Sequence, residues 1–205
     1  MRQRARKGEG DKLRDDILDA AETLLAERGH PDAVSVRAIA DRVGVSPPAI
    51  YLHFADKVEL FFACCSRRFV ELGEHMEAAA AREATALGRL EAMGRAYMQF
   101  GLERAEQYAV MMLGPVPDSL EITDLSDLPG AQALSMTAVA VGEGIAAGEL
   151  HPDLDPEATA VTLWAVCHGT VMVLLSKRGS TALPMPAEDL VVEHTLAIVR
   201  RGLRA

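Results

Sequence analysis

The feature that most limits how this chain can fold is the spacing of its apolar residues, which follows the 3.6-residue period of an α-helix from end to end. Apolar residues recur at intervals of three and four, as at Val36, Ile39, Ala40 and Val43. No run keeps the alternating pattern of a β-strand. The 205 residues are 49% hydrophobic, which is enough to bury a sizeable core. We therefore expect an all-α protein of about nine helices.

The formal net charge of −9 is unevenly distributed along the chain. Residues 1–57 contain 10 Lys+Arg and 10 Asp+Glu, whereas residues 58–205 contain 11 and 20. The most basic stretch is at the N-terminus, so we expect residues 1–10 to form a disordered basic arm, either a DNA contact or a solubilising tail. This distribution excludes a protein that coats nucleic acid by bulk charge, but not one that attracts it locally.

Residues 35–54 show the pattern of two short helices joined by a tight turn, the plan of a helix-turn-helix. Ser35 and Ser46 stand at expected helix N-caps, and Pro47 follows at a first helical position. Gly44 lies between the helices, where the turn needs a backbone angle that other residues disfavour. In such a motif the second helix presents its outer face to the major groove. A plain helical hairpin in an all-α core would show the same spacing.

A longer pattern surrounds this motif. It comprises Gly44-Val45-Ser46, Ile50-Tyr51-x-His53-Phe54, Lys57 and Leu60, preceded by a helix with Ile17, Ala21, Leu24 and Leu25. Residues 11–62 thereby resemble the DNA-binding head of the tetracycline-repressor (TetR) family. The resemblance implies a three-helix domain, residues 11–57, that binds double-stranded operator DNA.

The resemblance also implies DNA contacts at matching positions. Tyr51 and His53 would contact the DNA backbone, and Lys57 would bind phosphate. The full expected set is Ser35, Arg37, Ser46, Pro47, Pro48, Ala49, Tyr51, His53 and Lys57. The residues facing base edges, Pro47 to Ala49, can make only apolar contacts, for example with thymine methyl groups. We therefore expect specificity to depend on Arg37, on the arm or on DNA shape.

Behind the head lies an acidic helical body, residues 58–205, where the resemblance implies a C-terminal bundle that binds a small molecule and forms a homodimer through its last two helices. Trp164-Ala-Val-Cys-His168-Gly169 resembles the Trp…His-Gly signature of one subset of these domains. The candidates for the dimer seam are Val161, Leu174, Leu175, Leu190, Val191, Leu196 and Val199.

One face of the helix near residue 168 carries Trp164, His168 and Met172 at i, i+4 and i+8. This spacing predicts the wall of a ligand pocket with His168 as its polar group. The alternative is a core histidine beside a core tryptophan, which the absence of a metal or catalytic partner at helical spacing favours. Methionines at other positions fill a core or an adaptable pocket. The expected ligand-binding set is Tyr97, Phe100, Met111, Met112, Trp164, His168 and Met172.

Other classes of function find less support in the sequence. It contains no metal-ligand cluster, GxSxG, P-loop or GxGxxG, so we expect no metal, cofactor or catalytic residue. The three cysteines form no CxxC pair and the basic N-terminus lacks an apolar h-region, which favours the cytoplasm. The longest apolar stretch, residues 158–175, is interrupted by threonine, histidine and glycine, and predicts a buried helix rather than a membrane span.

These patterns together predict a ligand-responsive transcriptional repressor. As a dimer it would bind a palindromic operator, and a small, largely apolar effector would release it. Two alternatives stay open. One is a DNA-binding dimer without a small-molecule ligand, and the other, less favoured, is a small helical enzyme that uses His168.

Overall fold

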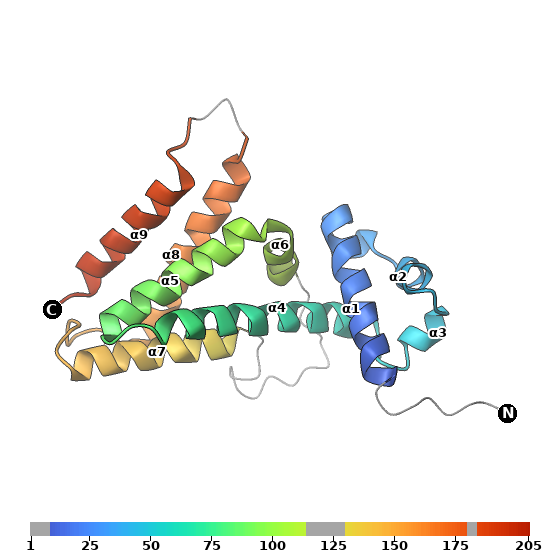
Figure 1. The fold of residues 1–205 in the computed structure, drawn as a ribbon, viewed down its shortest axis with the longest axis horizontal. Helices are drawn as coiled ribbons and strands as arrows, with labels where there is room; N and C mark the ends of the chain where they lie inside the picture. Colours follow the sequence, from blue (N-terminus) through green and yellow to red (C-terminus); the bar gives the residue numbers. More distant parts are fainter. Residues whose placement is uncertain (1–8, 114–129, 180–183) are drawn as a thin grey trace. The chain divides into compact units, whose positions relative to one another are not determined.

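The computed structural model describes residues 9–113, 130–179 and 184–205, and within these ranges the fold is all-α (Figure 1). The described residues form nine α-helices, one short 3-10 helix and an isolated bridge between Leu150 and Arg204. The helices are α1 (Glu9–Arg28), η1 (Pro31–Ala33), α2 (Val36–Val43), α3 (Pro47–Ile50), α4 (Lys57–Ala80), α5 (Ala86–Glu103), α6 (Ala105–Leu113), α7 (Ala131–Ala146), α8 (Pro156–Lys177) and α9 (Glu188–Leu203). The predicted fold class is confirmed.

The chain divides into two compact units. The first comprises Met1–Arg68 and Glu106–Ile122, and the second Phe69–Ala105 and Thr123–Ala205. The border falls inside α4 rather than at its start, because the first turns of α4 contact α1. Two residues expected in the basic arm, Glu9 and Gly10, are helical and belong to α1. Residues 1–8 of the arm lie outside the described residues.

A single apolar core holds the helices of the head together. Its members are the buried side chains of Ile17, Leu18, Ala20, Ala21, Leu24, Leu25, Val34, Ile39, Ala40, Ile50, Phe54, Leu60, Phe61 and Cys64. They come from α1, from the residue after η1, from α2, from the α3 region and from the start of α4. Because each fully buried large side chain contributes about 1.5–3 kcal/mol, this cluster fixes which face of each short helix points inward.

Local capping sets the ends of the short helices. The Ser35 hydroxyl accepts a hydrogen bond from the Ala38 amide at 3.1 Å and so begins α2. Gly44 ends it with φ +81°, and its amide donates to the Ala40 carbonyl at 2.9 Å. This left-handed conformation favours glycine, as the sequence predicts.

A reciprocal pair of hydrogen bonds begins α4. The Asp56 carboxylate accepts from the Glu59 amide at 2.8 Å, and the Glu59 carboxylate accepts from the Ala55 amide. Asp56 is thus the N-cap of the helix, and Glu59 reaches back past it to the amide of the preceding residue, an arrangement close to a capping box. It makes Lys57 the first residue of the helix.

An ion-pair cluster ties α1 to α4 within the first unit. Glu22 of α1 is buried, and its carboxylate accepts from Arg67 Nε at 3.0 Å and from Arg68 Nε at 2.8 Å. Arg67 also donates to Asp19 at 2.7 Å. Charge-assisted bonds of this kind are directional, so the cluster resists sliding of one helix along the other.

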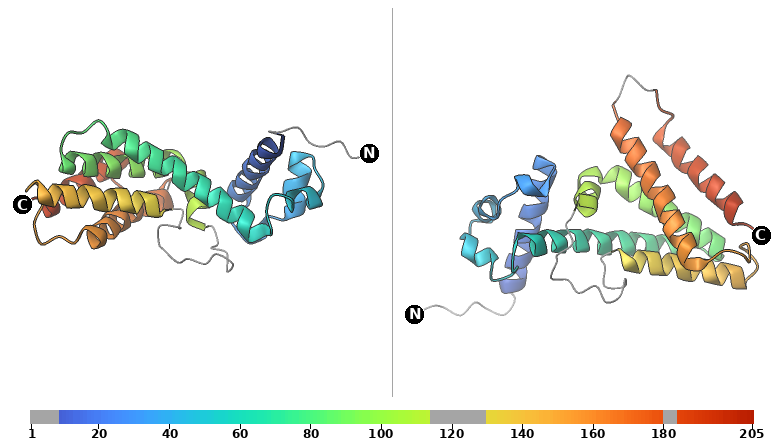
Figure 2. Two further views of the ribbon diagram at one scale, coloured as in Figure 1. Left: turned by 90° about the horizontal axis from the view of Figure 1, so that it is seen from below. Right: turned by 180° about the vertical axis from the view of Figure 1, so that it is seen from behind.

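The second unit is a bundle in which α5 packs against α7, α8 and α9, and α8 packs against α9 (Figure 2). Gly94 of α5 lies where three helices meet. A Cβ atom there would come within 3.2 Å of Leu196 in α9 and 3.5 Å of Cys167 in α8. Gly94 thus allows an approach that a larger residue would prevent.

The helix expected to be buried, α8, is buried on only one side within the protomer. Its inner residues are Thr159, Ala160, Cys167, Val171 and Leu174. By length and composition it could cross a membrane, and only 28% of its most apolar stretch is buried. Five large apolar side chains of α8 are exposed instead, namely Val161, Trp164, Val166, Met172 and Val173. Apolar content alone did not distinguish a core helix from one with an exposed apolar face.

The turn at Gly44 provides a test of the head's geometry. Nothing lies within 4 Å of a Cβ placed on Gly44, so Gly44→Ala adds backbone strain without a clash. We expect the free energy of unfolding of the head to fall by about 1–2 kcal/mol, measured by urea denaturation.

Gly73→Ala is the matched control, since Gly73 also has free space for a Cβ but lies inside α4. There the substitution should stabilise by about 0.5–1 kcal/mol. Equal effects at the two positions would contradict the left-handed turn.

Candidate functional site

The outer face of α3 follows from what its inner face buries. Backbone hydrogen bonds continue the helical turn past α3, since the His53 and Phe54 amides donate to the Ile50 carbonyl at 2.9 and 3.1 Å. Ile50 and Phe54 are buried in the core of the head. At about 100° per residue, Pro48 and Leu52 then lie on the opposite side. Leu52 is 82% exposed.

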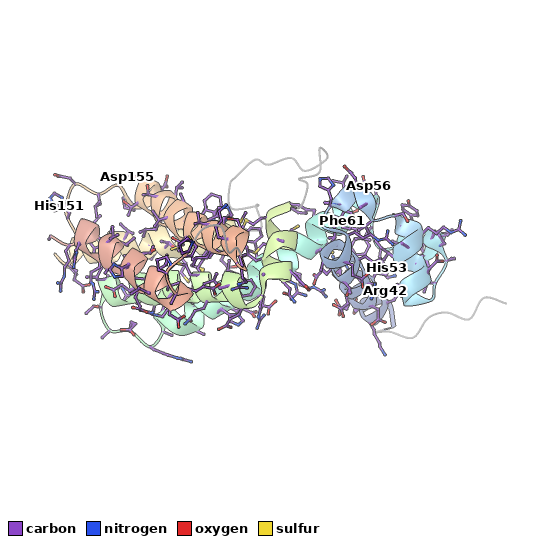
Figure 3. All side chains as sticks on the ribbon, turned by 90° about the horizontal axis from the view of Figure 1, so that it is seen from above. Arg42, His53, Asp56, Phe61, His151 and Asp155 are labelled. Atoms are coloured by element: carbon purple, nitrogen blue, oxygen red, sulfur yellow. The ribbon has the colours of Figure 1, made fainter. Side chains whose placement is uncertain are left out.

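The expected DNA-contacting residues lie in or beside α2 and α3, except Lys57, which begins α4. Figure 3 labels one of them, His53. Ser35, Arg37, Ser46, Pro48 and Tyr51 are exposed, and Pro47, Ala49, His53 and Lys57 are half-buried. Leu52 is absent from the expected set, because the motif leaves its position unspecified. The helical spacing from Ile50 and Phe54 was the signal that could have identified it.

The head also presents groups that suit phosphate. Among the described residues no acidic group pairs with Arg37, which is exposed on α2. Arg42, in contrast, donates from one guanidinium nitrogen to both carboxylate oxygens of Glu27, at 2.9 and 3.0 Å, so its charge is already paired within the head. Ser46 precedes α3 without a side-chain capping bond. These differences leave Arg37 and Ser46 available to an external anion.

Lys57 occupies a position that does not favour a cation. As the first residue of α4 it lies beside the partial positive charge of a helix N-terminus. Its ammonium group is 5.5 Å from the centre of the Phe61 ring, which partly compensates. A lysine at this position does not stabilise the helix, but its charge can bind an external anion.

In the second unit the structure brings together three of the expected ligand-binding residues. The Trp164 indole N–H donates to the Tyr97 hydroxyl at 3.0 Å, which links α8 to α5. The Trp164 and His168 rings lie 5.8 Å apart. Burial lowers the pKa of His168 below its ordinary value, which favours the neutral imidazole.

The other expected ligand-binding residues are placed differently. Phe100 is buried, but its ring lies against His75 and Arg104. The centres of the Phe100 and His75 rings are 5.6 Å apart, and the Arg104 guanidinium carbon is 5.2 Å from the centre of the Phe100 ring. Met111, which is buried, and Met112, which is half-buried, belong to α6 and therefore to the first unit. Trp164 and Met172 lie on the exposed side of α8, at 40% and 45% exposure.

The described residues offer little for nucleophilic or metal chemistry. Within them no group of three or more His, Cys, Asp or Glu side chains could hold a metal ion. Cys64 and Cys167 are free and buried. Burial raises the pKa of Cys167 to about 12 and raises that of Cys64 well above its usual range, so both remain protonated thiols.

Two family models match the chain. One, described as bacterial regulatory proteins of the tetR family, matches residues 17–64. The other, described as the tetracyclin repressor-like C-terminal domain, matches residues 90–199. The first thus covers most of the head, and the second covers more than half of the whole chain.

Curated relatives agree with these models. The HTH-type transcriptional activator FasR of Mycolicibacterium smegmatis is 34% identical over 90 residues, which are 44% of this chain and 41% of FasR. The HTH-type transcriptional repressor KstR of the same organism is 27% identical over 181 residues, which are 86% of this chain and 83% of KstR. The first three curated relatives are matched over only 41%, 34% and 33% of their own lengths.

A solved structure shows the same fold. It is that of the transcriptional regulator FadR from Bacillus subtilis in complex with stearoyl-CoA. The TM-score is 0.76 at 21% sequence identity, and the alignment covers 92% of this chain and 98% of that chain.

The bond between Trp164 and Tyr97 can be tested by fluorescence, because Trp164 is the single tryptophan of the chain. Tyr97→Phe removes the acceptor of the indole N–H. We expect the Trp164 emission to shift to the red as water replaces the hydroxyl, with stability lower by about 0.5–1.5 kcal/mol.

Tyr51→Phe removes an exposed tyrosine hydroxyl in the head and serves as the control, for which no emission change is expected. Unchanged emission in Tyr97→Phe as well would show that the bond does not form in solution.

Proposed function

The chain belongs to the TetR family of bacterial transcriptional regulators, and from this premise we propose that it is a ligand-responsive repressor. As a homodimer it binds a palindromic operator, and a small, largely apolar effector releases it. The observation that carries the DNA-binding part is the outer face of α3, held outward by the buried Ile50 and Phe54. The relatives include both a repressor, KstR, and an activator, FasR. That this chain represses rather than activates is therefore part of the proposal.

Residues 11–57 form the DNA-binding part in this proposal. The outer face of α3 enters the major groove, where Pro47, Pro48 and Ala49 approach base edges. Tyr51 and His53 contact the backbone. Arg37, Lys57 and the hydroxyls of Ser35 and Ser46 bind phosphate, and the basic arm adds further contacts.

Residues 58–205 sense the effector and form the dimer. Four apolar side chains of α8 and α9 are at least half exposed in the protomer, namely Val161, Val173, Leu190 and Ile198. Soluble monomers rarely leave such apolar surface on adjacent helices uncovered. A second copy would cover it across a two-fold axis.

This surface revises the expected seam in part. Leu174 and Leu196 were candidates for it, but both are buried inside the protomer, where they join α8 and α9 to the bundle. Val173 and Ile198 are exposed instead. Because both helices place apolar residues all around, spacing alone did not separate the inner faces from the outer ones.

The class of effector is inferred from chemistry and from a relative. Stearoyl-CoA is bound by the FadR protein of similar fold, and a long acyl chain is largely apolar. The neutral His168 and the Tyr97 hydroxyl supply polar groups beside the Trp164 ring, which suits such a ligand. The assignment to the Trp…His-Gly subset stays a prediction.

Release from DNA would proceed through α4. Effector binding in the body moves α4, and Glu22 transmits that movement to α1 through Arg67 and Arg68. A change in the separation of the two heads then weakens operator binding, with a coupling of about 1–3 kcal/mol. The chain acts in the cytoplasm, where operator DNA is accessible.

The second candidate is a DNA-binding dimer without a small-molecule ligand. It is favoured by the exposure of Trp164 and Met172, which would make them seam residues rather than pocket walls. Thermal-shift measurements with acyl-CoA esters separate the two candidates. Stabilisation that grows with ligand concentration supports a ligand-responsive regulator, and none across the series favours the ligand-free dimer.

Selection from random double-stranded DNA tests the DNA-binding part, and salt titration tests its contacts. Lys57→Gln and Arg37→Gln should each flatten the slope of log affinity against log salt by about 0.9 per protomer, because each loses one phosphate contact. Arg42→Gln is the control, since Arg42 already pairs with Glu27. If no sequence is enriched, or if all three variants keep the wild-type slope, this account of DNA binding is wrong.

The dimer seam can be tested at one residue. Ile198 is 67% exposed, so Ile198→Glu is tolerated by the protomer but places a charge in the proposed seam. We expect at least tenfold weaker dimerisation in sedimentation equilibrium, with unchanged helix content.

Val139→Glu introduces the same charge on α7 at another exposed valine and should leave the dimer intact. A dimer that survives Ile198→Glu unchanged would place the seam elsewhere.

A further inference from the structure

The outer face of α3 is almost devoid of hydrogen-bonding side chains. Pro48 and Leu52 lie opposite the buried face, with Ala49 and Tyr51 on either side. Leu52 is 82% exposed and Tyr51 51% exposed. The Tyr51 hydroxyl is the single polar side-chain group among these four residues.

The exposed position of Leu52 adds no apolar burial that would stabilise the fold. A leucine side chain that remains in water forgoes the stabilisation of about 1.5–3 kcal/mol that burial would give. The residues on either side in sequence turn the chain, since the Leu52 amide donates to the Ala49 carbonyl at 3.4 Å and Phe54 returns to the core. The side chain is thus displayed at the most outward point of the helical turn.

The cations of the head indicate what this face meets. Arg37 is exposed without an acidic partner among the described residues, and Lys57 stands at a helix N-terminus that does not favour it. An apolar centre with cations in the same small domain suits the major groove of DNA, which combines base edges with flanking phosphates. A purely apolar protein partner would not need the cations.

The major groove offers one apolar group. Guanine, adenine and cytosine present hydrogen-bond donors and acceptors there, whereas thymine adds a 5-methyl group to its O4 acceptor. An apolar side chain pressed against a polar base edge displaces water without replacing its hydrogen bonds, which is unfavourable. Against a methyl group the same side chain buries apolar surface, which is favourable.

We propose that this chain reads its operator through thymine 5-methyl groups, and that Leu52 is the principal reader of them. The proposal rests on the DNA-binding function proposed above and adds the chemical basis of its specificity. It predicts that the selected operator carries a thymine at the same position of each half-site, beneath Leu52. Pro48 and Ala49 contact neighbouring bases in the same manner.

The test replaces thymine by deoxyuridine at single positions of the operator obtained by selection. Deoxyuridine keeps the base pairing and lacks only the methyl group. At the position read by Leu52 we expect affinity to fall about fourfold per methyl group, and further when both half-sites are changed. In a second pair of operators, that thymine–adenine pair is replaced by 5-methylcytosine–guanine or by cytosine–guanine. The operator with 5-methylcytosine should bind more tightly, because it restores the methyl group.

Leu52→Ala assigns the effect to this side chain. On the thymine operator the variant should bind several-fold more weakly, and on the deoxyuridine operator it should bind as the wild type does, since the contact is already lost. Leu52→Asn should shift the selected base toward adenine, which asparagine recognises through two hydrogen bonds. Val139→Ala, an exposed valine of α7, is the control and should change neither operator's affinity.

The outcomes separate this proposal from the function on which it rests. If deoxyuridine costs less than twofold at every position while a sequence is still selected, the methyl readout is overturned and DNA recognition stands. The same holds if Leu52→Ala weakens both operators equally, because Leu52 would then act on the backbone. If no sequence is selected at all, the DNA-binding function itself fails.

Discussion

The burial of Ile50 and Phe54 in the core of the head is the contact on which the rest of the candidate interface depends. It fixes the rotation of a helix that is only 4 residues long and has little stability of its own. Everything on the far side of that helix is then directed outward, whatever its chemistry. The exposed Leu52 is a consequence of this constraint, and it gives the surface its apolar character.

The ion pairs of Glu22 extend the same constraint to α4. Because Arg67 and Arg68 bind one buried carboxylate, the first turns of α4 and the supporting helix α1 form one mechanical element. The N-cap bond between the Asp56 carboxylate and the Glu59 amide sets where that element begins. Directional hydrogen bonds as well as apolar contacts therefore pass a movement of α4 to α1. Apolar contacts alone would resist rotation of one helix against the other less strongly.

Local chemistry made much of this fold predictable from sequence. The hydrophobic period predicts the helices, and Ser35 and Gly44 mark helix ends by rules that involve only near neighbours. The placement of Leu52 and the outward face of α8 were harder to predict. The same apolar residues serve a core, a dimer seam or a DNA contact, and only the packing of distant segments decides which. The ligand site depends on such packing most of all, since Trp164 meets Tyr97 across 67 positions of sequence.

The central claim is that the core of the head presents α3 to DNA. Hydrogen–deuterium exchange with and without the selected operator tests it most directly, because amide exchange reports protection segment by segment. The account predicts slower exchange in residues 35–57 upon binding, with no such change when an unrelated duplex is added at the same concentration. Protection confined to residues 131–203, with the head unchanged, would contradict it.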